Sequence, residues 1–396
     1  MNDVQYGLAR YLLSTVQNPG IALNLLGRPK FMLNRLYGLL GFGYRFTDLA
    51  RIGLYVTTTC NMHCAMCDIG QANKKGMDHL RANQENTYFS LDLLTRLLDD
   101  PYVRRRRLFF DLKITEPLLH PDICEIVRLI KKAGHTVQIA TNGYLLPDKA
   151  KELLKTGLDF IQVSIDGPEK VHDGIRGVNG AYRNAIDGIR MLNQDANLRI
   201  DALYAVSCLN DSEILNFFDA IGNEGIRIDM LKFQFMFFVS REMMIKQNEK
   251  YEIKTTESSI SDTVNPDKVD TAQVHRQLNA IRSIKDKYKN IRNITVIPSL
   301  RSEKQIAEYF NVAGNKIKGN SKCTWPWERL IMTTDGRILI HSRCFDFCYG
   351  DFNQSGMGDI FNNETINTFR KRFRNADYCY PACTRCCGVI YHGLLF

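Results

Sequence analysis

The sequence predicts an α/β fold, a partial (β/α)6 barrel of parallel strands with a small C-terminal domain that contains a β-hairpin. Apolar strand-like segments alternate with amphipathic helical patterns from about residue 51 onward. This alternation is typical of a parallel sheet with helices on its outside, and six such units are fewer than the eight that close a barrel. Ten of the 12 cysteines gather near residue 60 and after residue 322, where we expect metal chemistry.

The elements follow one another in a regular order. Strands are expected at 52–56, 108–112, 136–140, 160–165, 200–206 and 230–238, with helices at 91–98, 123–133, 149–156, 181–193 and 212–224. Residues 49–240 therefore form the predicted core. Residues 241–318 begin as a polar stretch and predict an insertion or linker, with helices at 272–287 and 303–310 and a short strand at 294–297.

The two ends of the chain differ from this core. Residues 1–48 have mixed three- and four-residue apolar spacing, which predicts a helical extension packed on the core. The alternative is a face that lies on a membrane surface. Residues 319–396 form the predicted C-terminal domain, where apolar runs flank Asp335-Gly336, a pair that favours a tight hairpin turn.

Composition narrows the class of protein and its compartment. The net charge is +9, but the basic residues are dispersed, and no motif that reads nucleic-acid bases is visible. The dense run 104–107 predicts a solvated surface, with an anion-binding site as the alternative. No signal-peptide order and no apolar run of about 18 residues are present, so we expect a cytoplasmic protein, peripheral at the membrane in the alternative. Clustered cysteines in a reducing compartment more often bind metal than form disulfides.

Three cysteines follow the first predicted strand directly. Cys60, Cys64 and Cys67 have the spacing C-x3-C-x2-C. Three thiolates on so compact a loop can bind one face of a [4Fe–4S] cubane and leave the fourth iron without a protein ligand. The alternative is a tetrahedral zinc site with His63 as fourth ligand, for which His63 is poorly placed because it adjoins Cys64 in the same tight loop.

This segment, with apolar Met66 before the last cysteine, resembles the signature of the radical S-adenosylmethionine superfamily. Residues 113–119 resemble the segment that ends the second strand of that family, usually Gly-Gly-Glu-Pro, although Ile114 and Thr115 replace the two glycines. Residues 141–143, 162–168 and 172–177 resemble the later strand ends. Each of these segments alone contains residues that commonly form turns in proteins, but here the segments occur in the family's order.

The resemblance implies a [4Fe–4S] cluster on the triad and S-adenosylmethionine bound to its open iron. The methionyl ammonium would donate a hydrogen bond to Glu116. Ser164 and Arg176 would contact the ribose or the carboxylate, and Asp166 would orient its loop or the substrate. The implied cofactor site consists of Thr115, Glu116, Asn142, Ser164, Asp166 and Arg176. No general base is identified.

The C-terminal cysteines resemble the SPASM/Twitch extension of the same superfamily. The resemblance implies at least one auxiliary [4Fe–4S] cluster, held by Cys323, Cys344, Cys383 and Cys386. Cys348, Cys379 and Cys387 remain for a second cluster in the alternative, and a zinc with four cysteine ligands is a further alternative. Cys124 and Cys208 are isolated and predict small core residues.

The resemblance implies an oxidoreductase that cleaves S-adenosylmethionine and abstracts hydrogen from its substrate. We expect it to oxidise or epimerise a small molecule such as a sugar, sugar nucleotide or lipid-linked glycan, with an electron donor such as flavodoxin or ferredoxin. A peptide-modifying maturase is one alternative, and a non-catalytic iron–sulfur or zinc protein is another. Residues near later strand ends are candidate pocket residues: Tyr204, Lys232, Gln234 and Arg241.

Overall fold

The computed structural model describes residues 33, 47–67, 88–255, 257–259, 264–315, 323–339, 345 and 347–386. Nearly all of the predicted helical extension lies outside these residues, as do Cys344 and Cys387. Within the described residues, no helix is both long enough and apolar enough to cross a bilayer.

One ten-stranded sheet organises the chain, in the order β10-β9-β8-β1-β2-β3-β4-β5-β6-β7. Neighbours from β8 to β7 pair in parallel, and β8, β9 and β10 pair antiparallel as the C-terminal hairpin region. This arrangement confirms the predicted α/β fold with a parallel sheet and a hairpin. The strands are β1 (Arg51–Leu54), β2 (Phe109–Leu112), β3 (Thr136–Thr141), β4 (Phe160–Ser164), β5 (Arg199–Val206), β6 (Met230–Phe235), β7 (Ile294–Ile297), β8 (Arg329–Met332), β9 (Arg337–Leu339) and β10 (Cys348–Asp351).

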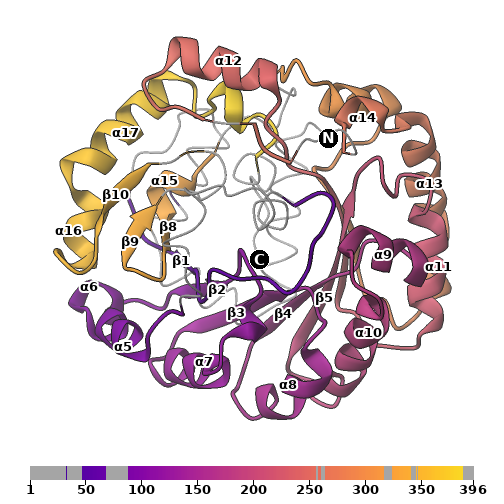
Figure 1. Cartoon of the computed structure of the whole chain (residues 1–396), viewed down its shortest axis with the longest axis horizontal. Coiled ribbons are helices and arrows are strands. Elements are labelled where there is room, and N and C mark those ends of the chain that lie inside the picture. The colour runs from indigo at the N-terminus through magenta and orange to yellow at the C-terminus, as the bar shows by residue number, and fades with distance from the viewer. Residues whose placement is uncertain are drawn as a thin grey trace.

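Helices cover the outside of the curved sheet, as Figure 1 shows. The first of them, α5, begins at Ser90, whose hydroxyl accepts a hydrogen bond from the Leu93 amide at 3.1 Å and so satisfies a donor at the helix start. The helices are α5 (Leu91–Asp99), α6 (Pro101–Arg104), α7 (Ile123–Lys132), α8 (Leu146–Leu153), α9 (Glu169–Arg176), α10 (Ala181–Leu192), α11 (Ile214–Asn223), α12 (Arg241–Lys250), α13 (Thr271–Ser283), α14 (Glu303–Phe310), α15 (Trp325–Glu328), α16 (Met357–Asn362) and α17 (Glu364–Asn375).

Some elements differ from the sequence prediction. The last predicted core strand, 230–238, ends at Phe235. Residues 172–177, expected to continue a strand end, fall instead on helix α9 (Glu169–Arg176) and on Gly177, which ends the helix with a left-handed φ of 68°. The polar stretch after residue 240 includes helix α12, which Ser240 caps by accepting from the Met243 amide at 3.1 Å.

The tail strand β8 lies next to β1, the strand that leads into the cysteine triad. Arg51 pairs with Arg329, and Leu54 pairs with Met332. The pairing is continued before β1, where the Ala50 amide donates to the Glu328 carbonyl at 2.8 Å. The sheet therefore runs without interruption from the C-terminal segment into the core.

The two faces of the sheet have opposite character. Alternate residues such as Phe110, Ile161 and Leu231 are fully buried in the main apolar core, which lies between the strands and the outer helices. The residues between them, including Asp111 and Lys232, lie on the inner face. Polar and charged side chains therefore line the inside of the curved sheet.

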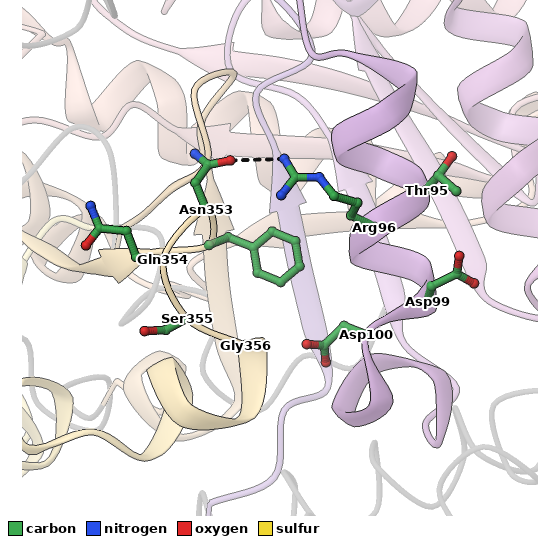
Figure 2. A pocket seen from close by; sticks show the side chains of 9 residues that line it. Thr95, Arg96, Asp99, Asp100, Asn353, Gln354, Ser355 and Gly356 are labelled. Atoms are coloured by element: carbon green, nitrogen blue, oxygen red, sulfur yellow. Dashed lines mark hydrogen bonds between the residues drawn. The ribbon is translucent and has the colours of Figure 1, made fainter.

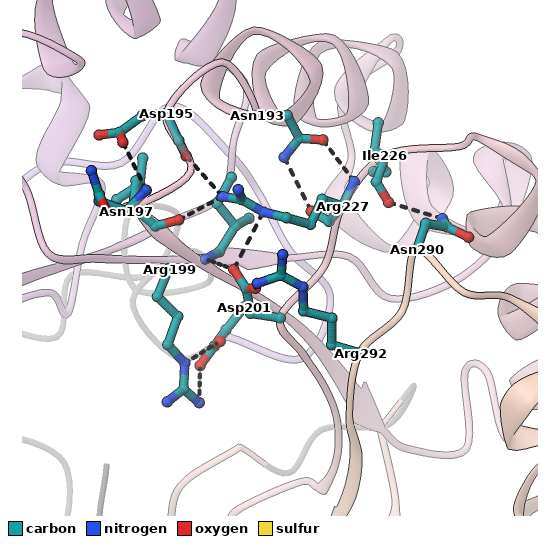
Figure 3. Close-up of polar contacts among 12 residues, drawn as sticks. Asn193, Asp195, Asn197, Arg199, Asp201, Ile226, Arg227, Asn290 and Arg292 are labelled. Carbon is teal, nitrogen blue, oxygen red and sulfur yellow. Dashed lines mark hydrogen bonds and ion pairs between the residues drawn. The ribbon is translucent and has the colours of Figure 1, made fainter. Parts of the chain in front are cut away.

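The amino ends of β5, β6 and β7 are held together by a separate polar network (Figure 3). The Arg227 guanidinium donates to the carbonyls of Leu198 at 2.6 Å and Asp195 at 3.0 Å. The Asn193 side chain accepts from the Arg227 amide at 2.6 Å, and Asp229 forms an ion pair with Arg292 at 2.7 Å. This network stabilises the end of the sheet opposite to the strand-end motifs.

Candidate functional site

The triad loop is fixed by the end of helix α9. The amides of His63 and Ala65 donate to the carbonyls of Arg176 at 3.2 Å and Ile175 at 2.9 Å. Gly177 follows directly, and a Cβ at this position would lie 3.2 Å from the His63 carbonyl oxygen. The loop conformation therefore depends on a close backbone contact with α9.

The three thiols lie in a largely apolar setting. Cys64 is buried in a small cluster with Met62 and Ala181, and Cys60 and Cys67 pack against that cluster. Burial raises the pKa of Cys60 to about 12 and also raises the pKa of Cys64, and the neighbouring thiolates raise both further.

These thiols are the donor set that iron–sulfur clusters use. As the side chains stand, no group of three His, Cys, Asp or Glu residues in the described part of the chain closes around a metal ion. A bound cluster would stabilise the thiolates that burial disfavours, because metal ligation deprotonates cysteine. The triad fits a cluster by its chemistry and by the fixed loop that carries it.

A buried carboxylate lies where β2 ends. Glu116 is 1% exposed, and its side chain accepts hydrogen bonds from the Thr141 hydroxyl at 2.7 Å, the Asn142 amide at 2.7 Å and the Leu118 amide at 3.0 Å. Burial raises the pKa of Glu116, and these hydrogen bonds oppose the rise. Two neighbouring strand ends, β2 and β3, are thus joined through one side chain.

Asn142 continues this connection to the triad. Its side-chain amide donates to Asn61 Oδ1 at 2.7 Å and lies 3.9 Å from the Cys60 sulfur. The predicted residues Glu116 and Asn142 are therefore brought together beside the cysteines. Asn61 was not identified from the sequence, although its position inside the cysteine loop is a signal for such a role.

One of the two residues that replace the family's glycines has an unusual backbone conformation. Ile114 has a φ of 101°, a conformation that glycine adopts readily and a β-branched residue adopts rarely. The hydroxyl of Thr115 donates to the Thr57 carbonyl at 2.6 Å, next to the triad loop. The turn after β2 thus retains a glycine-like conformation without glycine.

Asp166 and Arg176 form a buried ion pair near Cys64, with Oδ2 and Nη2 2.5 Å apart. Nη1 of Arg176 lies 3.7 Å from the Cys64 sulfur, and its charge opposes the rise in the pKa of Cys64. Asp166 also accepts from the Ala205 amide at 2.9 Å. Ser164 ends β4 two residues earlier and is half-buried.

Two residues that sequence reasoning missed position Asp166. His172 Nδ1 accepts from the Asp166 amide at 2.9 Å, and the Asn210 side chain donates to the Asp166 carbonyl at 2.9 Å. Burial lowers the pKa of His172 well below its ordinary value, so the imidazole is neutral and can accept this bond. Its position in the motif 172–177 was visible in the sequence, but its partner was not.

The candidate pocket residues separate into two groups. Lys232 and Gln234 lie on the inner face of β6 and are buried. Tyr204 instead lies on the outer face, where its hydroxyl donates to the Asn210 carbonyl at 2.5 Å and its ring packs 4.8 Å from that of Phe217. Arg241 is an exposed first residue of α12. The expectation that Tyr204 lines a pocket is wrong, because strand alternation turns it toward the helices.

The tail places four cysteines in its buried interior. Cys323, Cys379, Cys383 and Cys386 are at most 9% exposed, whereas Cys348 is exposed on β10. The Cys323 amide donates to the Tyr378 carbonyl at 3.0 Å, which connects the start of the tail to its last turn. Three of the four predicted auxiliary ligands are therefore buried, and Cys344 lies outside the described residues.

A polar hollow on the surface between α5 and residues 352–356 is separate from this site (Figure 2). Arg96 donates to Asn353 Oδ1 at 3.0 Å across it, and Asp100 accepts from the Met357 amide at 3.0 Å. These contacts attach the tail to α5. The hollow contains no cysteine or histidine.

The fold and the site define a class of protein: a partial α/β barrel of parallel strands with a three-cysteine loop at the carboxyl end of its first strand. Residues 54–221 match the family described as the Radical SAM superfamily, so this part of the chain is similar to a radical SAM domain. Members of this superfamily use a [4Fe–4S] cluster and S-adenosylmethionine.

Curated relatives match over less than half of this chain. An AdoMet-dependent heme synthase of Methanosarcina barkeri is 30% identical over 41% of this chain and 44% of its own length. A GTP 3',8-cyclase of Limosilactobacillus fermentum is 30% identical over 48% of this chain and 55% of its own length. The chain thus spans about half the length of these curated relatives.

Solved structures share the fold over most of the chain. The structure of anSMEcpe with bound AdoMet and Cp18Cys peptide has a TM-score of 0.57 at 14% identity, covering 86% of this chain and 91% of that one. Streptococcus suis SuiB bound to its precursor peptide SuiA has a TM-score of 0.52 at 15% identity, covering 87% and 72%. At these identities the likeness concerns the fold.

Proposed function

We propose that Cys60, Cys64 and Cys67 hold a [4Fe–4S] cluster and that the strand ends beside them bind S-adenosylmethionine. The observation that carries this proposal is the series of buried and half-buried contacts from Glu116 through Asn142 and Asn61 to the triad. When bound, the cluster and cofactor supply a 5′-deoxyadenosyl radical that abstracts hydrogen from substrate.

The residues around the triad have distinct roles in this proposal. Three hydrogen bonds hold the Glu116 carboxylate in place, where it would accept a hydrogen bond from the methionyl ammonium. Thr115 has a hydroxyl at the same strand end as Glu116, and Ser164 has one at the end of β4. The Asp166–Arg176 pair keeps the α9 turn in place and a positive charge beside Cys64, where it stabilises a thiolate.

For the tail we propose an auxiliary [4Fe–4S] cluster on Cys323, Cys344, Cys383 and Cys386. The burial of Cys323, Cys383 and Cys386 supports this assignment. Cys379 is equally buried and, with Cys348 and Cys387, would supply a second cluster. A nearby cluster suits net oxidation, because it can accept the second electron of a substrate radical; a structural zinc in the tail would not.

We propose that the reaction oxidises or epimerises a small molecule, such as a sugar, sugar nucleotide or lipid-linked glycan, with flavodoxin or ferredoxin as electron donor. Modification of a peptide is the second candidate, favoured by the shared fold of peptide-bound anSMEcpe and SuiB. For a lipid-linked substrate, we propose that residues 1–48 contact the membrane.

The test is anaerobic reconstitution followed by measurement of 5′-deoxyadenosine. The wild-type protein is expected to form it with a chemical reductant, and Cys64→Ala is expected to form none. Cys386→Ala is expected to retain cleavage and to lose product from a deuterated substrate. Cleavage by Cys64→Ala at the wild-type rate would refute the cluster assignment, and equal loss in both variants would assign the tail a stabilising role only.

A further inference from the structure

A fully buried arginine, Arg385, lies in the sequence between two of the proposed auxiliary ligands, Cys383 and Cys386. These three residues belong to one tight turn, in which the Cys386 amide donates to the Cys383 carbonyl at 3.0 Å. A charged side chain is almost never fully buried, because taking an ion out of water is costly unless its hydrogen bonds are satisfied. The arginine therefore depends on specific partners inside the protein.

The partners of Arg385 lie at the end of helix α14. Its guanidinium donates from Nε to the Tyr309 carbonyl, from Nη2 to the Glu308 carbonyl at 2.7 Å and from Nη1 to the Asn315 carbonyl at 3.0 Å. Carbonyls in the last turn of a helix lack partners within the helix and carry partial negative charge, so a cation is stabilised there. These hydrogen bonds attach the cysteine turn to α14.

Helix α14 is attached in turn to the barrel. The hydroxyl of Tyr309, itself fully buried, donates to the Met236 carbonyl at 2.9 Å, directly after the carboxyl end of β6. Its ring lies 5.4 Å from that of Phe235, the last residue of the strand. Tyr309 thus binds the strand end through its hydroxyl and Arg385 through its carbonyl. Buried contacts therefore run from the end of β6 to the cysteine turn.

Helix α12 supports the same arrangement. Ser240, its N-cap, donates a hydrogen bond to the Val312 carbonyl in the segment after α14. The ring of Tyr251, directly after α12, lies 4.6 Å from that of Tyr380, whose carbonyl accepts from the Cys383 amide at 2.9 Å. Part of the predicted insertion or linker thus connects the barrel to the cysteine turn.

We propose that Arg385 is a positioning residue for the auxiliary cluster: it fixes the turn 383–386 on the end of α14 and thereby sets the place of the cluster relative to the end of β6. This inference rests on the proposed function, because it takes Cys383 and Cys386 as cluster ligands. The planar guanidinium can donate to several carbonyls at once, which neither glutamine nor lysine can do in the same geometry.

The test is hydrogen–deuterium exchange of the reconstituted protein, with iron analysis and electron paramagnetic resonance of the same samples. Arg385→Gln is expected to raise amide exchange in residues 378–386 about tenfold and to lose the iron and the signal of the auxiliary cluster, while the triad signal remains. Arg385→Lys keeps the charge at the helix end but reaches fewer carbonyls, so a smaller rise of about threefold is expected. It replaces Arg385→Gln in the comparison if the glutamine variant does not fold.

Two control variants distinguish this role from a general loss of stability. Arg227→Gln removes another largely buried guanidinium from two carbonyls, at the opposite end of the sheet. Tyr309→Phe removes the hydroxyl that binds the end of β6 but keeps the carbonyl that binds Arg385. Both controls are expected to leave exchange in residues 378–386 and the auxiliary signal unchanged.

Unchanged exchange in the Arg385 variant, or an equal rise in either control, would overturn the inference. The outcome for the proposed function is separate. If the reconstituted wild type has no auxiliary cluster signal and the Arg385 variant still loosens the turn, the cluster assignment is wrong and the positioning of the turn stands. An auxiliary signal that stays at the wild-type level in Arg385→Gln gives the reverse result.

Discussion

Single side chains connect strand ends that are distant in sequence. Glu116 at the end of β2 holds the start of the β3 turn, and Asn142 in that turn holds Asn61 in the cysteine loop. Each contact is buried or half-buried, so the loss of one partner leaves a polar group unsatisfied. Substitutions here act on both stability and cofactor binding.

Glu116→Gln is expected to lower the free energy of unfolding by about 1–3 kcal/mol, because the NH2 group that replaces one carboxylate oxygen would face either the Asn142 amide or the Leu118 amide and Thr141 hydroxyl. It should also weaken binding of S-adenosylmethionine. Chemical denaturation and equilibrium binding measure the two effects. Glu152→Gln, at an exposed ion pair with Lys155, serves as the control and should change neither. Unchanged stability and binding in Glu116→Gln would contradict the assigned contacts.

The buried carboxyl of Asp111 should make the stability of the protein depend on pH. Although burial raises its pKa, the charges of Lys113, Arg329 and Arg51 bring the value down to about 2. A carboxyl whose folded pKa is depressed stabilises the fold above its unfolded pKa of about 3.9, and this contribution is lost as the pH falls toward 2. Asp111→Asn should therefore cost about 2 kcal/mol at pH 6.

The difference between wild type and Asp111→Asn should shrink below about pH 4. Urea denaturation at pH 7, 5 and 3 measures it. Asp92→Asn, at an exposed helix position, should show no such trend. A gap that stays constant down to pH 3 would show that Asp111 is not ionised by its neighbours.

At the level of elements, helix α9 determines the shape of the cysteine loop. Two glycines near its end have left-handed backbones, Gly177 with a φ of 68° and Gly180 with a φ of 76°. Only Gly177 contacts the loop; no atom lies within 4 Å of a Cβ placed at Gly180. Substituting each glycine in turn therefore distinguishes the effect of backbone strain from the effect of a steric contact with the cysteine loop.

Both Gly177→Ala and Gly180→Ala should lose about 1 kcal/mol of stability from strain. Gly177→Ala should in addition reduce the iron retained after reconstitution, because its methyl group pushes the His63 carbonyl. Iron and sulfide analysis of the two purified variants measures this. Equal iron content would show that α9 does not control the loop.

The elements themselves were largely predictable, because each depends on neighbouring residues. Apolar runs indicated the strands, and Asp335-Gly336 indicated the hairpin turn, which the structure confirms. Pairing between β8 and β1 was not predictable, since no local pattern in Arg329–Met332 specifies a partner. The Asn61–Asn142 contact and the common face of Arg51 and Lys232 likewise arise only from tertiary packing. The cysteines were visible because their spacing lies within one loop.

At the scale of the molecule, the tail completes the sheet. β8 hydrogen-bonds to the edge of β1 that faces away from β2, and the buried tail residues Trp327 and Phe373 belong to the same apolar core as Leu54. The tail and the barrel should therefore unfold together.

Removal of residues 319–396 should expose the β1 edge and give an insoluble or unfolded product. The full chain should show a single denaturation transition by both fluorescence and circular dichroism. A soluble, folded fragment 1–318, or two separate transitions in the full chain, would show that the tail is an independent unit.

The most direct test of the proposed cofactor site is electron paramagnetic resonance of the reduced protein before and after addition of S-adenosylmethionine. If the triad leaves one iron without a protein ligand, S-adenosylmethionine should alter the cluster signal in the wild type and in Cys386→Ala. Loss of that signal component is expected in Cys64→Ala. A spectrum that S-adenosylmethionine leaves unchanged, or a responsive signal that persists in Cys64→Ala, would contradict the assignment.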